Sequence, residues 1–148
     1  MAEKIKIIFK SAVLTSTAMI VYFFLLRGLS IDEMPALRLL NFIFILLGIN
    51  YTIEKNIKIN KETQYWKNFM AGMYSSLLTV VIALTILTIY VNYVQPSFIN
   101  ILQNSFFFWE HDFSFSSIIF IIFIQGILVS LVSAFLVMLY WKKNLPKF

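Results

Sequence analysis

The densest group of side chains able to do acid–base chemistry is the run Glu110, His111 and Asp112. A carboxylate beside a histidine can relay protons or ligate a metal ion. Neighbouring positions on a helix do not face one another, so a metal would need further ligands from elsewhere. We therefore interpret this run as a solvated outer-face polar cluster that begins a helix. A membrane enzyme with His111 as its acid–base group is the weakest of our function hypotheses.

Other recognisable catalytic patterns are missing from the sequence. The chain has no cysteine, which excludes disulfides, thiolate metal sites and a cysteine nucleophile. It also has no phosphate-binding glycine loop, HExxH or GxSxG pattern. We therefore expect a non-enzymatic protein that needs no cofactor and no metal.

The elements that would carry any site are long apolar blocks. Hydrophobic residues make up 60% of the chain, whereas about 45–50% is usual in soluble domains. Because the excess lies in blocks rather than at the spacing of an amphipathic helix, it indicates membrane spans. We predict one all-α integral membrane domain over residues 1–148. Its four transmembrane helices are expected at about 11–26, 35–51, 69–93 and 115–141.

One junction organises this layout, where a basic segment meets an uncharged one. Residues 54–67 read as a cytoplasmic basic loop that carries Lys55, Lys58, Lys61 and Lys67. The following stretch, Phe69 to Tyr93, has no charge and would be about 37 Å long as a helix, enough to cross a bilayer.

The distribution of basic residues predicts the topology. Ten of the 12 lysines and arginines fall in the N-terminal segment, the basic loop and the C-terminal segment, which four spans place on one side. Because loops rich in lysine and arginine stay in the cytoplasm, we expect both termini there. The apolar run at 11–26 has no clear cleavage site after it, so we expect a retained span rather than a signal peptide.

The linker between the third and fourth spans is unusually aromatic. Ser97 to Gln103 predicts a short amphipathic helix, and Phe106 to Trp109 form a cluster suited to a membrane interface. The sequence leaves open whether residues 97–109 lie on the membrane or cover a neighbouring element.

Small residues spaced three or four apart predict where the helices pack. Apolar burial does not drive helices together in lipid, but close contact through small side chains does. One such seam lies in the third span at Gly72, Ser76, Thr79 and Ala83, and another in the fourth at Gly126, Ser130 and Ala134. We expect the seams to pack the bundle, the alternative being that one of them docks a partner or a second copy.

A few polar residues remain inside the spans as candidate contacts. Gln125 is the one amide near mid-bilayer, and Asn41 lies nearer the end of the second span. Because an unpaired amide is costly in hydrocarbon, Gln125 should face protein or water, most simply through an interhelical hydrogen bond. The alternative is contact with a substrate or ion.

The charged residues at the ends of the spans also allow two interpretations each. Arg27 and Arg38, with Asp32 and Glu33, either anchor the helices to headgroups or form an ion-pair cluster that docks a partner. The basic loop either fixes topology or also attracts anionic lipid or an acidic partner. We expect no nucleic-acid partner, because the lysines flank apolar blocks.

A family resemblance follows from the segments LLGINYTIEKN and KETQYWKNFMAGMYSSLL. A span ending in Leu47-Gly48-Ile49, a basic loop, an aromatic-Lys-x-Phe start and Gly72 together are similar to an uncharacterised family of small four-span bacterial membrane proteins, domain of unknown function 4199. The resemblance covers most of the chain as layout and about 25 residues as motif. It implies a multi-pass protein of the bacterial inner membrane and assigns no activity.

The function hypotheses follow from what the spans contain. Small-residue seams, short loops and the lack of charge deep in any span favour an accessory or assembly subunit of a larger membrane complex. The alternative is a small oligomeric transporter or channel for an uncharged or lipid-like solute, using Gln125 and the Ser/Thr faces.

Overall fold

The computed structural model describes residues 2–29, 40–104 and 114–144, and every regular element in these ranges is helical. The elements are α1 (Ala2–Gly28), α3 (Leu40–Asn60), α4 (Tyr65–Ile89), the π-helical segment η1 (Tyr90–Val94), α5 (Phe98–Asn104) and α6 (Phe115–Asn144). The predicted all-helical class is confirmed. Predictions for Asp32, Glu33, Arg38, Phe106–Trp109 and the run Glu110, His111, Asp112 lie outside the described residues.

Three helical stretches are long and apolar enough to cross a membrane: Glu3–Gly28, Tyr65–Val94 and Phe115–Lys143. They correspond to the first, third and fourth predicted spans. Because such lengths of apolar helix are characteristic of bilayer-spanning segments, the chain is a helical membrane protein.

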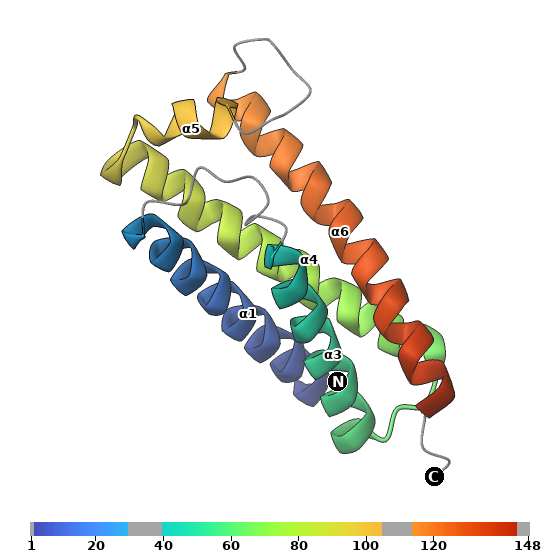
Figure 1. The fold of residues 1–148 in the computed structure, drawn as a ribbon. Helices are drawn as coiled ribbons and strands as arrows, with labels where there is room; N and C mark the ends of the chain where they lie inside the picture. The colour runs from blue at the N-terminus through green and yellow to red at the C-terminus, as the bar shows by residue number, and fades with distance from the viewer. Residues whose placement is uncertain (1, 30–39, 105–113, 145–148) are drawn as a thin grey trace.

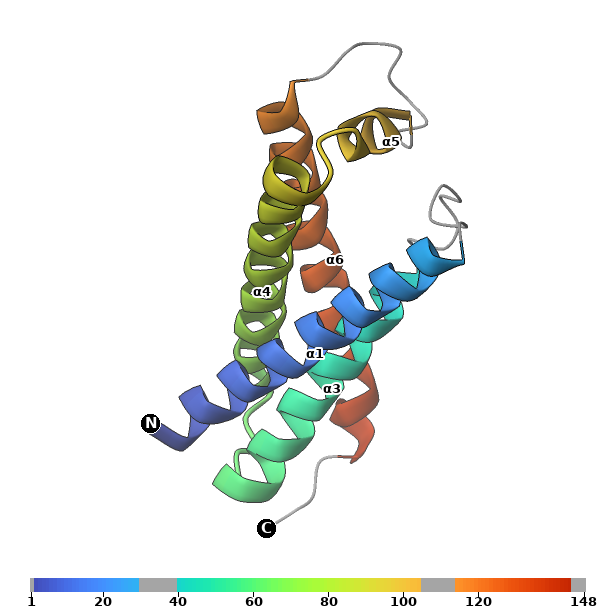
Figure 2. The ribbon, with the colours of Figure 1, turned by 90° about the vertical axis from the view of Figure 1, so that its left-hand side faces the viewer.

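The four long helices lie side by side (Figure 1). The α4 helix contacts α1, α3 and α6, and α3 contacts both α1 and α6. The pair α3–α4 therefore forms the middle of the bundle, with α1 and α6 on opposite sides of it. A view turned by 90° shows α1 inclined to α4, so that the two diverge toward the end where α1 finishes (Figure 2).

The predicted basic loop is mostly helix, which corrects the sequence interpretation. Ile45, Ile49, Ile53 and Ile57 are spaced four apart and all are buried, so one apolar stripe continues well past residue 51. This stripe keeps α3 packed until Asn60, and α4 begins at Tyr65 rather than Phe69. The connection is only residues 61–64. Likewise, the predicted N-terminal segment is already part of α1.

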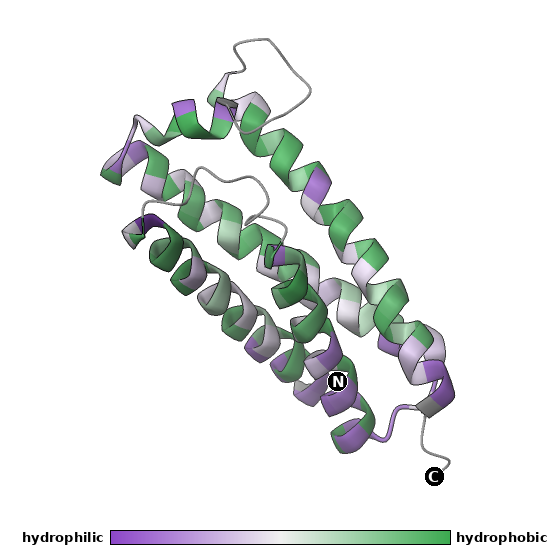
Figure 3. Cartoon of the chain, in the orientation of Figure 1, coloured by the Kyte–Doolittle hydropathy of each residue, from purple (hydrophilic) through white to green (hydrophobic). Residues whose placement is uncertain are grey.

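Hydrophilic residues gather at one end of the bundle, where α1 begins and where α3 and α6 end (Figure 3). Nine lysines lie in the helices that meet there and in the connection between α3 and α4: Lys4, Lys6, Lys10, Lys55, Lys58, Lys61, Lys67, Lys142 and Lys143. We call this the basic end. The opposite end carries Arg27, η1 and α5.

In the linker, residues 98–104 form the short helix α5, which packs on neighbouring elements. Phe98 and Leu102 are buried against Tyr90, Val91 and Ile118. The α5 helix therefore covers the end of α4 and the start of α6, with its apolar side turned toward the protein.

Candidate functional site

Helices α3 and α4 are joined by a buried polar ladder, which we define as Thr52, Asn56, Asn68 and Ser75. The Asn56 amide donates to the Asn68 carbonyl oxygen over 2.6 Å, and Thr52 Oγ1 donates to Ser75 Oγ over 3.0 Å. All four residues are almost completely buried. Because amides and hydroxyls bond strongly only at fixed geometry, the ladder sets the register of α3 against α4.

Sequence reasoning missed most of this ladder. Asn56 and Asn68 stand in or beside the predicted basic loop, where an amide would simply be solvated. The available signal was the isoleucine stripe, because Asn56 lies beside Ile53 and Ile57 on the same helical face. That stripe extends the helix and brings Asn56 inside.

A close approach between α1 and α3 occurs at Gly48. A β-carbon at this position would lie 2.2 Å from Thr15 Oγ1, and Ser11 Oγ donates to the Gly48 carbonyl over 2.9 Å. Because these contacts need the backbone itself to be accessible, glycine is required here.

The two predicted seams lie within the bundle. Gly72 faces Ile49 and Ile53 of α3, where an added β-carbon would be 2.9 Å from Ile49 Cγ2. Gly126 faces Val80 of α4, with 2.6 Å to Cγ1. Ser76, Thr79, Ser130 and Ala134 are buried as well, and Ala83 lines a pocket described below.

Gln125 does not make the interhelical hydrogen bond expected of it. Its side chain is exposed on α6 and bonds to none of the residues that the structure describes. The reason is its place on the helix, because Gly126, Ser130 and Ala134 point inward and position 125 is turned about 100° from Gly126. Gln125 thus lies on the α6 outer face, whose exposed apolar members include Phe120, Ile124, Leu128, Leu131, Val132 and Phe135.

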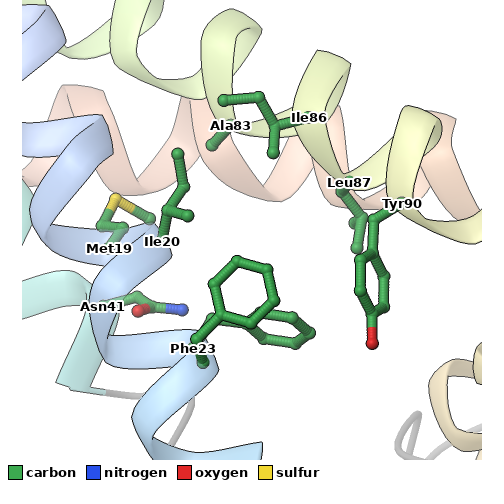
Figure 4. A pocket seen from close by; sticks show the side chains of 9 residues that line it. Met19, Ile20, Phe23, Asn41, Ala83, Ile86, Leu87 and Tyr90 are labelled. Carbon is green, nitrogen blue, oxygen red and sulfur yellow. The ribbon is translucent and has the colours of Figure 1, made fainter. Parts of the chain in front are cut away.

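A pocket of about 150 Å³ lies between α1, α3 and α4 (Figure 4). Its wall is apolar, with Met19, Phe23, Ile86 and the Tyr90 ring, and none of the described residues that line it carries a charge. Among the described lining residues, Asn41 of α3 contributes the one amide, and its Oδ1 is buried without a hydrogen-bond partner among them or elsewhere in the described chain.

Arg27 packs against η1 and α5 at the end of the bundle next to this pocket. Its guanidinium lies 5.6 Å from the centre of the Tyr90 ring and 5.4 Å from that of Phe98, and it donates to Gln95 Oε1. The Tyr90 hydroxyl donates to the same Gln95 oxygen over 3.0 Å. Arg27 therefore stabilises the cap formed by η1 and α5, in addition to any headgroup contact.

The lysines of the predicted basic loop are distributed over two helix ends and the turn between them. Lys58 pairs with Glu54 over 2.5 Å, and Lys67 pairs with Glu62 over 3.3 Å. Burial alone would raise the pKa of Glu62, but the Gln64 backbone N–H and the Lys67 ammonium outweigh it, so that the pKa lies below its ordinary value. Among residues 2–29, 40–104 and 114–144, no cluster of histidine, aspartate and glutamate could hold a metal ion.

No family model, curated protein or solved structure matches the chain.

Proposed function

We propose that the chain is a non-enzymatic accessory or assembly subunit that binds a larger membrane protein through the α6 outer face. The observation that carries this proposal is Gln125, an exposed amide in the middle of an apolar transmembrane helix. Both the N–H and C=O groups of an amide lose their water partners in hydrocarbon. A helix of another chain that supplies a hydrogen bond would stabilise the contact by about 0.6–2 kcal/mol.

The packing of the bundle favours the same face. The small-residue seams on α4 and α6 are already used inside the chain, whereas the other side of α6 carries only large apolar residues around Gln125. The hydrogen bond would supply the specificity that this apolar surface lacks, because lipid tails satisfy apolar side chains as well as a protein does.

We also propose that α3 is a fourth span, with both termini in the cytoplasm of a bacterium and the chain in its inner membrane. The α3 helix packs along α4, and nine lysines share the basic end, as the positive-inside rule requires. A relationship to domain of unknown function 4199 would agree with this topology.

The test is purification of the tagged chain in mild detergent, followed by native mass spectrometry. We expect a larger membrane protein in fixed stoichiometry, lost in Gln125→Leu and retained in Gln125→Asn. Thr85→Val is the matched control, because the Thr85 hydroxyl is exposed on α4 but already bonded to the Val81 carbonyl over 2.8 Å. A chain that purifies alone contradicts the proposal, and a homo-oligomer favours the transporter alternative.

A further inference from the structure

The pocket between α1, α3 and α4 is a recess at the place where α1 and α4 diverge, and its volume is about 150 Å³. Apolar cavities of roughly this size take up benzene-sized molecules. The space is therefore sufficient for part of a small apolar ligand or for a segment of a long hydrocarbon.

The polar group in the wall specifies what the ligand must offer. Asn41 Oδ1 is buried, and neither this oxygen nor the Asn41 amide nitrogen bonds to any of the described residues. The amide lies at the edge of the pocket beside Phe23 (Figure 4). A hydroxyl group satisfies both arms of an amide, since it donates to the carbonyl oxygen and accepts from the nitrogen.

The remaining polar atom of the lining does not compete for this ligand. The Tyr90 hydroxyl is directed to Gln95 Oε1, so Tyr90 contributes its ring to the wall. Because no charged residue lines the pocket in the part of the chain that the structure describes, an ionised ligand would lose its hydration there without compensation.

Access is from the side of the bundle. Phe24 on α1 and Ile86 on α4 border the pocket and are both exposed, by 51% and 37% respectively. The pocket therefore opens between two membrane-spanning helices, toward the apolar region that surrounds them.

We propose that this pocket binds an uncharged, mainly apolar molecule that bears a hydroxyl group, such as a long-chain or isoprenoid alcohol, with the hydroxyl bonded to Asn41. The site lies on a different side of the bundle from the α6 outer face, so it stands independently of the proposed docking function.

The test uses a diazirine-bearing long-chain alcohol and the matched alkane that lacks the hydroxyl, applied to the full chain in phosphatidylcholine nanodiscs. After photolysis, peptide mapping locates the label. We expect saturable labelling by the alcohol at Met19, Phe23 or Ile86, about tenfold stronger than by the alkane, as one buried hydrogen bond allows. Equal labelling by the two probes, or label spread evenly over the exposed faces, overturns the proposal.

Two variants separate the pocket from its hydroxyl specificity. Ala83→Phe fills the pocket and should reduce the label there about tenfold, whereas Val81→Phe, on an exposed side of α4, should leave it unchanged. Asn41→Leu should make alcohol and alkane label equally, with Asn100→Leu on the exposed side of α5 as the control. If the alcohol keeps its advantage in Asn41→Leu, the assigned hydrogen bond is wrong even where Ala83→Phe fails to fold.

Discussion

The side chains of Asn56 and Asn68 join two helices across a turn of four residues, with 2.6 Å between Asn56 Nδ2 and Asn68 Oδ1. Asn68 also donates to the Glu62 backbone carbonyl over 2.8 Å, and Asn60 donates to Asn56 Oδ1 over 2.8 Å. The contact thus belongs to a small network in which the turn itself takes part. Because the side-chain amides of Asn56 and Asn68 each take part in two of these hydrogen bonds, removal of one residue leaves buried polar groups of the others without partners.

Asn56→Ala should destabilise the bundle by about 1–2 kcal/mol, because it leaves the buried Asn68 oxygen without its donor. The measurement is reversible unfolding in mixed micelles of increasing denaturing detergent. Asn92→Ala is the control at an exposed position and should stay within about 0.5 kcal/mol of the parent. Equal effects of the two substitutions would show that the network contributes nothing.

Gly48→Ala should cost about 1–3 kcal/mol, because the new methyl group would lie 2.2 Å from Thr15 Oγ1 and push α1 away from α3. Combining it with Thr15→Ala removes the nearest atom and should restore part of the loss. Gly28→Ala is the matched control, since nothing lies within 4 Å of a β-carbon there. The same unfolding assay reports all variants, and a neutral Gly48→Ala would refute the close approach.

The Glu62 carboxylate should make stability depend on pH in the acid range. Its pKa is lowered below 4.5 in the folded chain, so its contribution is fully present above the unfolded pKa and is lost as the pH falls through the folded value. Glu62→Gln should therefore flatten the acid limb of a plot of stability against pH, while stability trends above about pH 6 stay parallel. An unchanged acid limb would contradict the assigned interactions with Gln64 and Lys67.

The absence of cysteine makes the topology directly testable with single substitutions. Thr63→Cys lies in the turn at the basic end, and Ser97→Cys lies at the opposite end beside α5. We expect a membrane-impermeant maleimide to label Ser97→Cys in intact cells and Thr63→Cys only after permeabilisation. The reverse pattern would invert the proposed orientation, and labelling of both from outside would remove α4 as a span.

Much of the fold could be predicted from sequence because the length and apolar composition of membrane helices are visible in the sequence. The cores of α4 and α6 fall within the predicted blocks, and the glycines of both seams lie at helix contacts. The extent of α3 was wrong for a physical reason. Lys55 and Lys58 suggested a loop, although the helix turns them away from the buried stripe formed by Ile53 and Ile57.

The candidate sites were harder to predict because they depend on which way a helix faces. In α6 the small residues Gly126, Ser130 and Ala134 mark the inward side, and Gln125 is turned about 100° from Gly126. The expected interhelical hydrogen bond of Gln125 took no account of this direction, which the packing of Gly126 against Val80 makes plain. The pocket beside Asn41 arises from the divergence of α1 and α4, a property of three helices together that no single segment encodes.

The four-residue connection between α3 and α4 also has a consequence for the order in which the chain assembles. Asn56 and Asn68 are twelve positions apart, so their contact closes a short loop and can form as soon as both have left the ribosome. The Trp141 indole N–H, by contrast, reaches Asn50 across 91 positions and must wait for the final helix. We therefore expect the α3–α4 hairpin to be complete early in synthesis and α6 to join it last, at the face that α4 still offers.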